Sequence, residues 1–188
     1  MPCSDMKDEA LLKEISNDSH KAFDELYLRY SPLVKSFAFC LLKNAEESLD
    51  VCQNVFMKIW ANRESLDSIS PFKPYLYVIV KNHILDLIEK KHPLSFTDAG
   101  LTDEELTNWV DLSDLDRADY AEKLLLCRIA LETMPEKRRR LFYMSRRDHL
   151  TYKEIADREG VSVKTVEYHI SKALLELRNL MKVLACFL

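Results

Sequence analysis

Residues 151–174 read TYKEIADREGVSVKTVEYHISKAL, and this stretch decides the fold of the C-terminal part of the chain. Thr151 and Glu154 have the spacing of a capping box, in which each side chain accepts a hydrogen bond from the other residue's backbone N–H. Gly160 follows where the end of a helix favours a left-handed residue, and Ser162 is placed to cap a second helix. The stretch therefore predicts two short helices joined by a tight turn, a helix-turn-helix.

The second of these helices is predicted to be amphipathic. Its buried face is marked by apolar residues at helical spacing, namely Val163, Val166, Ile170, Ala173, Leu174 and Leu177. The opposite face carries Lys164, Thr165, Glu167, Tyr168, His169, Ser171 and Lys172. Hydrogen-bonding side chains near the N-terminus of a second helix are what reading the DNA major groove requires. An ordinary helical hairpin with a solvated outer face is the alternative; the short turn, the caps on both helices and the basic flanks count against it.

The composition favours helices throughout. The chain has only two glycines, Gly100 and Gly160, whereas the turns between strands usually need glycine. Its 188 residues are 47% apolar, enough for one domain or two small ones with real cores. We therefore predict an all-α fold with two small helical domains.

The cysteines indicate no metal site. Cys3, Cys40, Cys52, Cys127 and Cys186 are scattered, without a Cys-x-x-Cys pair or a histidine at zinc-binding spacing. We expect free thiols in a reducing cytoplasm, and no cofactor. The N-terminal stretch is too acidic for a signal peptide, and no run of about 18 uncharged apolar residues predicts a membrane span.

Charge is distributed unevenly along the chain. The net charge is −4, but residues 135–182 hold twelve Lys and Arg against seven Asp and Glu. Residues 93–122 hold nine acidic residues against the single Arg117. Because salt screens charges beyond about 10 Å, the local sign matters more than the total. A basic C-terminal block is thus separated from the rest by an acidic connector.

The N-terminal half reads as a series of helices. Residues 8–30 predict one helix or a broken pair, interrupted at residues 17–19; Pro32, with Ser31 as cap, is expected to begin the next helix. Residues 44–62 predict a third helix, capped by Asn44. Its apolar stripe is Leu49, Cys52, Val55, Phe56, Ile59 and Trp60. Residues 62–74 contain Ser70-Pro71 and Lys73-Pro74 and are expected to form a loop, followed by a helix over 75–91.

The chain divides, on these patterns, into domains at 8–92 and 119–182, joined by a flexible acidic linker at 93–118. In the second domain, Leu124 to Leu131 belong to a first helix, and Pro135 starts the next. The core of that next helix is expected at Leu141, Phe142 and Met144.

Four segments in this order resemble the extracytoplasmic-function sigma factors of bacterial RNA polymerase. They are FDELYLRY (23–30), SLDVCQNVFMKIW (48–60), FKPYLYVIVKNHILDLIEKK (72–91) and residues 134–178. The resemblance covers nearly the whole chain, and the wording SVKTVEYHISKAL is especially like that of Bacteroidetes-type members. It implies a dissociable subunit that gives core RNA polymerase its promoter specificity.

The resemblance also implies three sets of binding residues. The helix at 48–60 would dock on the clamp of the largest polymerase subunit through Asp50, Gln53, Asn54 and Lys58. The non-template strand of the −10 element would contact Phe72, Tyr75, Tyr77, Lys81 and Asn82, although the family often carries Trp near position 75. The −35 duplex would contact Lys164, Thr165, Tyr168, His169 and Lys172, with Arg138, Arg139, Arg146, Arg147 and Lys153 on the phosphate backbone.

Other functions remain open or are excluded. A free-standing helix-turn-helix regulator with a sensing or dimerising N-terminal half is the alternative function. An enzyme is not expected, because the five histidines are dispersed and no phosphate-binding glycine loop, H-E-x-x-H motif or nucleophile elbow occurs. The partners that the resemblance implies are core RNA polymerase, through its largest-subunit clamp and its flap, and promoter DNA. It also implies an anti-sigma protein as a further partner.

Overall fold

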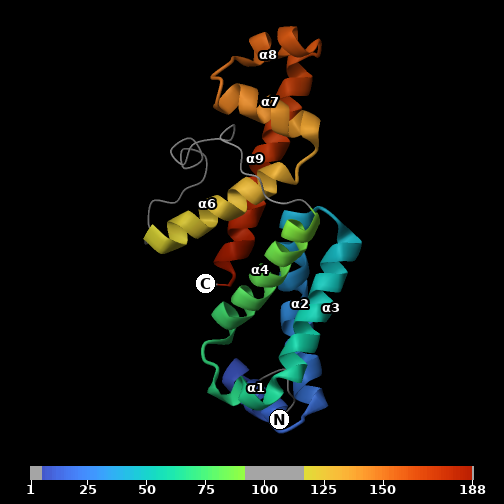
Figure 1. Cartoon of the computed structure of the whole chain (residues 1–188), viewed down its shortest axis with the longest axis vertical. Coiled ribbons are helices and arrows are strands. Elements are labelled where there is room, and N and C mark those ends of the chain that lie inside the picture. The colour runs from blue at the N-terminus through green and yellow to red at the C-terminus, as the bar shows by residue number, and fades with distance from the viewer. Residues whose placement is uncertain (1–5, 92–116, 188) are drawn as a thin grey trace. The chain divides into compact units, whose positions relative to one another are not determined.

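The computed structural model describes residues 6–91 and 117–187, and all regular structure in these two stretches is helical (Figure 1). The predicted all-α fold is confirmed. The predicted linker lies outside the described residues, except for its last two. By contacts within the chain, Met1–Pro93 with Val183–Leu188 form one compact unit, and Leu94–Lys182 form the other.

The N-terminal unit begins with a broken pair of helices, one of the two arrangements expected for residues 8–30. α1 spans Asp8–Ser16 and α2 spans His20–Leu42. Asp18 between them has a left-handed backbone, with φ at 64°, and Ser19 caps α2 by accepting from the Ala22 N–H. α1 buries Leu11, Leu12 and Ile15 against its neighbours.

The expected helix boundary at Pro32 is wrong, because α2 runs through this proline without a break. Proline removes one intrahelical hydrogen bond. Pro32 is exposed, however, and the apolar stripe continues unbroken on the other side from Leu26 and Tyr30 to Val34 and Phe37. Burial of this long stripe outweighs the one lost bond, since each fully buried large side chain contributes about 1.5–3 kcal/mol.

α3 (Ala45–Ala61) begins at the predicted cap, where the Asn44 side chain accepts from the N–H groups of Glu46 and Glu47. A 3-10 helix, η2 (Arg63–Ser68), follows, and then α4 (Phe72–Lys91). α4 begins three residues earlier than expected, with Pro74 in its first turn. The first N–H groups of a helix have no intrahelical partner, so proline is tolerated there.

The helices of this unit pack around one core. α2, α3 and α4 contact one another, and α1 packs on both α2 and η2 (Figure 1). The core side of α4 consists of Phe72, Leu76, Val80, Ile84 and Ile88.

The C-terminal unit contains α6 (Arg117–Glu132), α7 (Glu136–Arg146), α8 (Tyr152–Glu159) and most of α9 (Val163–Ala185). Leu141, Phe142 and Met144 are buried on α7, as predicted. Val163 was predicted on the buried face of α9 but is 44% exposed, because it is the first residue of the helix and precedes the packed stripe that starts at Val166.

Candidate nucleic-acid interface

One face of α3 presents a mixed polar and apolar surface. Asp50, Gln53, Asn54 and Lys58, the residues predicted to bind polymerase, are all exposed. Leu49 and Met57 lie among them, 48% and 68% exposed. The six residues form two adjacent rows, each advancing by four positions along the helix. We call them the α3 ridge.

Leu49 corrects the predicted buried stripe of α3. The stripe in the structure is Ser48, Val51, Cys52, Val55, Phe56 and Ile59, and Leu49 lies outside it, in line with Gln53 and Met57. Trp60 lies at the edge of the core, with its ring 4.4 Å from that of His20 and 5.0 Å from that of Phe23. Sequence patterning misses the apolar part of the ridge, since it places Leu49 in the buried stripe and gives Met57 no role.

A shallow groove of about 350 Å³ opens beside the N-terminal end of the α3 ridge. It is lined by Lys35, Ser36 and Phe39 of α2 and by Ala45, Ser48 and Leu49 of α3. Phe39 is 49% exposed. The groove and the ridge together make one surface on which the exposed apolar side chains of Phe39, Leu49 and Met57 alternate with polar and charged ones, and protein interfaces combine both kinds of group.

The residues predicted to contact the −10 strand differ in their exposure. Phe72 belongs to the core at 2% exposure, and its ring meets Tyr30 edge-on at 5.2 Å. Tyr75 and Tyr77 are half-buried, and Asn82 is exposed. The Lys81 ammonium lies 5.4 Å from the centre of the Tyr77 ring, a cation–π contact. Asn82 and the edges of the two tyrosines therefore offer polar and aromatic groups at the surface of α4.

The helix-turn-helix has the predicted local geometry. The Thr151–Glu154 capping box is present at the start of α8, and Gly160 ends α8 with φ at 63°. The Ser162 hydroxyl accepts from the Thr165 N–H at 3.1 Å, which caps α9. Val166, Ile170, Ala173 and Leu177 are buried.

The exposed face of α9 carries the predicted reading residues. Lys164, Tyr168 and Lys172 are exposed, whereas Thr165 and His169 are half-buried. Tyr168 is 55% exposed, and the Lys172 ammonium lies 5.9 Å from its ring centre. These side chains form the surface that a DNA groove would meet.

Most of the predicted phosphate-binding arginines form ion pairs within the unit. Arg138 on α7 pairs with Glu176 on α9, and Arg139 pairs with Glu132 at 2.8 Å. Arg147 pairs with its neighbour Asp148, also at 2.8 Å. Arg146 is half-buried, and this burial lowers its pKa. Lys153, in the first turn of α8, is exposed.

His169 is held in a positively charged environment. Its Nδ1 atom is buried without a hydrogen-bond partner among the described residues. Burial lowers the pKa of His169, and the positive charges of Arg138 and Lys137 lower it further. The lowered pKa favours the neutral imidazole, and because Nδ1 is buried, Nε2 is the nitrogen left to donate or accept a hydrogen bond at the surface.

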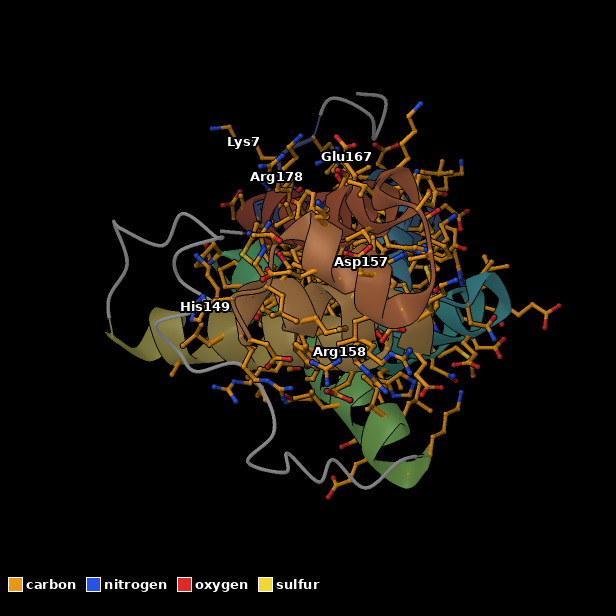
Figure 2. The ribbon with its side chains drawn as sticks, turned by 90° about the horizontal axis from the view of Figure 1, so that it is seen from above. Lys7, His149, Asp157, Arg158, Glu167 and Arg178 are labelled. Atoms are coloured by element: carbon orange, nitrogen blue, oxygen red, sulfur yellow. The ribbon has the colours of Figure 1, made fainter. Side chains whose placement is uncertain are left out.

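Two exposed arginines of this unit, Arg158 and Arg178, were not predicted to be binding residues. Figure 2 shows Asp157 and Arg158 on α8 and Glu167 and Arg178 on α9, and all four are exposed. Arg158 is the seventh residue of α8 and Arg178 the sixteenth of α9, so each stands apart in the sequence from the basic residues of α7.

The described residues contain no cluster of three or more His, Cys, Asp or Glu side chains arranged to bind a metal. No described helix is both long and apolar enough to cross a membrane.

Two family models match the chain, in sequence order. Sigma-70 region 2 matches residues 26–93, and sigma-70 region 4 matches residues 128–177. The first match includes α3, η2 and α4, and the second includes the helix-turn-helix.

Curated relatives match over most of their length. The chain is 29% identical to the ferric citrate uptake sigma factor FecI of Escherichia coli K12, over 81% of this chain and 86% of FecI. It is 25% identical to the ECF RNA polymerase sigma factor SigW of Bacillus subtilis, over 89% of this chain and 93% of SigW. Among solved structures, that of CnrH in complex with the cytosolic domain of CnrY matches at 23% identity with a TM-score of 0.41, over 93% of this chain and 97% of CnrH.

Proposed function

The chain belongs to the extracytoplasmic-function group of the sigma-70 family, which directs promoter-specific transcription initiation, and we propose how its surfaces are used. One surface binds core polymerase, a second binds the −10 element, and a third binds the −35 element. The observation that carries the proposal is the order of the two family matches, region 2 before region 4. The exposed residues on these helices include all four predicted polymerase contacts on α3 and Asn82, Lys164, Tyr168 and Lys172. We propose domains at residues 8–92 and 119–182, joined by the acidic segment 93–118. The protein acts by binding and has no catalysis of its own.

The α3 ridge and the adjoining groove are proposed to bind the clamp of the polymerase. Leu49 and Met57 supply apolar area on one row of the ridge, and Gln53 between them and Asp50 beside them supply hydrogen bonds. These exposed apolar side chains favour a protein partner over a merely solvated helix face, because large apolar side chains gain free energy only when a partner covers them.

The η2–α4 region is proposed to bind the non-template strand of the −10 element. Opening the duplex costs a few kcal/mol per unstacked base, and stacking and hydrogen bonds to the released bases offset this cost. Tyr75, Tyr77 and Asn82 are proposed to contact the strand, and Lys81 its phosphates. Phe72, being buried, is proposed to support this surface instead of stacking on a base.

α9 is proposed to read the −35 element as duplex. Thr165, Tyr168 and His169 are proposed to meet base edges, and Lys164, Lys172 and Lys153 the phosphates. The ion-paired Arg138, Arg139 and Arg147 and the half-buried Arg146 contribute less to phosphate binding, since part of their charge is already compensated or shielded. Promoter DNA, core polymerase and an anti-sigma protein are the proposed partners, and the cytoplasm is the proposed location.

The test is binding to core polymerase. Replacing Asp50 and Gln53 together with alanine is expected to weaken the affinity at least about tenfold, which corresponds to about 1.4 kcal/mol. The matched control is Lys21→Ala with Asp24→Ala, an exposed polar pair on α2 of the same unit. Unchanged polymerase binding in the α3 variant, or an equal loss in the control, would refute the proposed docking surface.

The alternative, a free-standing helix-turn-helix regulator, predicts a different result. It expects a stable dimer on a palindromic operator without polymerase. It also expects that the Asp50 and Gln53 substitutions leave DNA binding and gene control unchanged.

A further inference from the structure

α1 and the turn after it contact both sides of residues 62–71, which comprise η2 and the turn before α4 and belong to the region proposed to bind the −10 strand; we call this segment the loop. α1 packs along α2 (Figure 1) and against η2. Leu66 of η2 is completely buried. Leu11, Leu12 and Ile15 of α1 are at most 1% exposed. The helix is thus part of the support on which the loop rests.

The first connection joins the start of α1 to the start of α4. Asp8 accepts a hydrogen bond from Arg29 Nη1 at 2.7 Å and another from the Tyr30 hydroxyl. Arg29 Nη2 also donates to the Met6 carbonyl at 3.1 Å. The Tyr30 ring, 4% exposed, packs edge-on against Phe72, the first residue of α4. Asp8 therefore fixes Tyr30, and Tyr30 fixes the C-terminal end of the loop.

The second connection joins the α1–α2 turn to the start of η2. Asp18 in this turn pairs with Arg63 Nε. Arg63 also donates to the Trp60 carbonyl at 3.2 Å and lies 5.0 Å from the centre of the Trp60 ring. The Asp18 side chain is 70% exposed, against 25% for Asp8. The second connection is the weaker one, because exposed ion pairs contribute little.

Between the two connections the loop exposes short polar side chains, among them Ser65, Asp67, Ser68 and Ser70. A loop that is ordered before DNA arrives does not have to be ordered during strand capture, so more of the contact energy remains for opening the duplex. We propose that α1 positions this loop for strand separation, with Asp8 and Tyr30 as the main positioning residues and Asp18–Arg63 as a secondary connection. This inference rests on the proposed −10 function.

The test compares promoter opening on two templates. Asp8→Asn and Tyr30→Phe remove the charge and the hydroxyl while keeping the shape of each side chain. With core polymerase, both are expected to reduce permanganate-reactive open complexes on a duplex promoter by about tenfold, as expected for loss of a charge-assisted hydrogen bond. Asp18→Asn is expected to give a smaller loss. On a template already unpaired at the −10 element, all three should transcribe like the unaltered protein.

Matched controls separate positioning from general damage. Asp24→Asn and Tyr27→Phe make the same chemical changes on α2. Asp24 is exposed, and the Tyr27 ring packs on Phe56, whereas the Tyr30 ring packs on Phe72. Neither control should reduce promoter opening. Polymerase binding should be unchanged in every variant. A loss that persists on the pre-melted template would overturn the inference, because it would show a merely structural role.

Two other outcomes distinguish the inference from the function on which it rests. If Tyr75→Ala and Asn82→Ala reduce opening but Asp8→Asn and Tyr30→Phe do not, the −10 function stands and the positioning role is refuted. If none of the four reduces opening, both are refuted.

Discussion

Thr151 and Glu154 determine where the helix-turn-helix begins. The Thr151 N–H donates to Glu154 Oε2 at 2.8 Å, and the Glu154 N–H donates to the Thr151 hydroxyl at 3.3 Å. The Thr151 hydroxyl, which also donates to Glu154 Oε2 at 2.7 Å, lowers the pKa of Glu154, and the Thr151 N–H lowers it further. The pairing was predictable from the sequence, because the partners are three residues apart. The Arg138–Glu176 ion pair was not, since its partners are 38 positions apart and meet only through the packing of two helices.

Thr151→Ala is expected to lower the free energy of unfolding by about 1 kcal/mol, through loss of the cap. Urea unfolding of the full chain, followed by circular dichroism, measures this. Ser171→Ala, at an exposed position inside α9, should cause no loss. Equal stability of Thr151→Ala and the unaltered protein would contradict the capping role.

His83 on α4 is expected to make folding sensitive to acid. Burial lowers its pKa, the charges of Lys58 and Lys90 lower it further, and Asp86 opposes them. Because the unfolded chain binds this proton more tightly, the stabilisation is complete above about pH 6.5 and is lost as pH falls toward the lower pKa of the folded state. An NMR titration should show the depressed pKa, and Lys58→Gln should raise it. A His83 pKa that Lys58→Gln leaves unchanged would show that the Lys58 charge does not act on it.

At the scale of the element, the existence of the described helices was largely predictable and their limits were not. Pro32 and Pro74 have the same sequence signal, yet one lies inside α2 and the other in the first turn of α4. The difference lies in the apolar stripe around Pro32, which packs on other helices. Leu49 and Val163 show a second kind of error. Helical spacing assigns both residues to the buried face, but both lie at the edge of the core and are exposed.

The two kinds of residue on α9 should respond differently to substitution. Lys172→Ala is expected to weaken binding of the polymerase complex to all promoters alike and to reduce the salt-dependence slope by about 1. Tyr168→Ala is expected to weaken the discrimination between bases at one −35 position, by about 1–3 kcal/mol of binding free energy. Binding to a set of −35 variants at several salt concentrations separates the two effects. Lys21→Ala, at an exposed position on α2, is the charge-matched control. A base preference altered by Lys172→Ala and not by Tyr168→Ala would reverse these assignments.

At the scale of the whole molecule, the sequence predicted the order of the two family regions, because each motif is local. It predicted less well which side chains are available for binding. Arg138, Arg139 and Arg147 count as positive charges in the sequence but are paired with carboxylates in the structure. The basic C-terminal block is therefore less attractive to phosphate than its composition indicates.

The protein alone is consequently expected to bind promoter DNA weakly. Its net charge is −4, and non-specific binding with few phosphate contacts has dissociation constants of about 10⁻⁴–10⁻⁶ M. On core polymerase, two weak contacts share one platform, and the second forms at an effective concentration in the millimolar range. Fluorescence anisotropy with promoters carrying both elements, only the −35 element or only the −10 element tests this. Without polymerase the three should bind alike; with polymerase the two-element promoter should bind at least about a hundredfold more tightly than either single-element promoter. Tight, sequence-specific binding by the protein alone would favour the free-standing regulator, because such binding requires no platform.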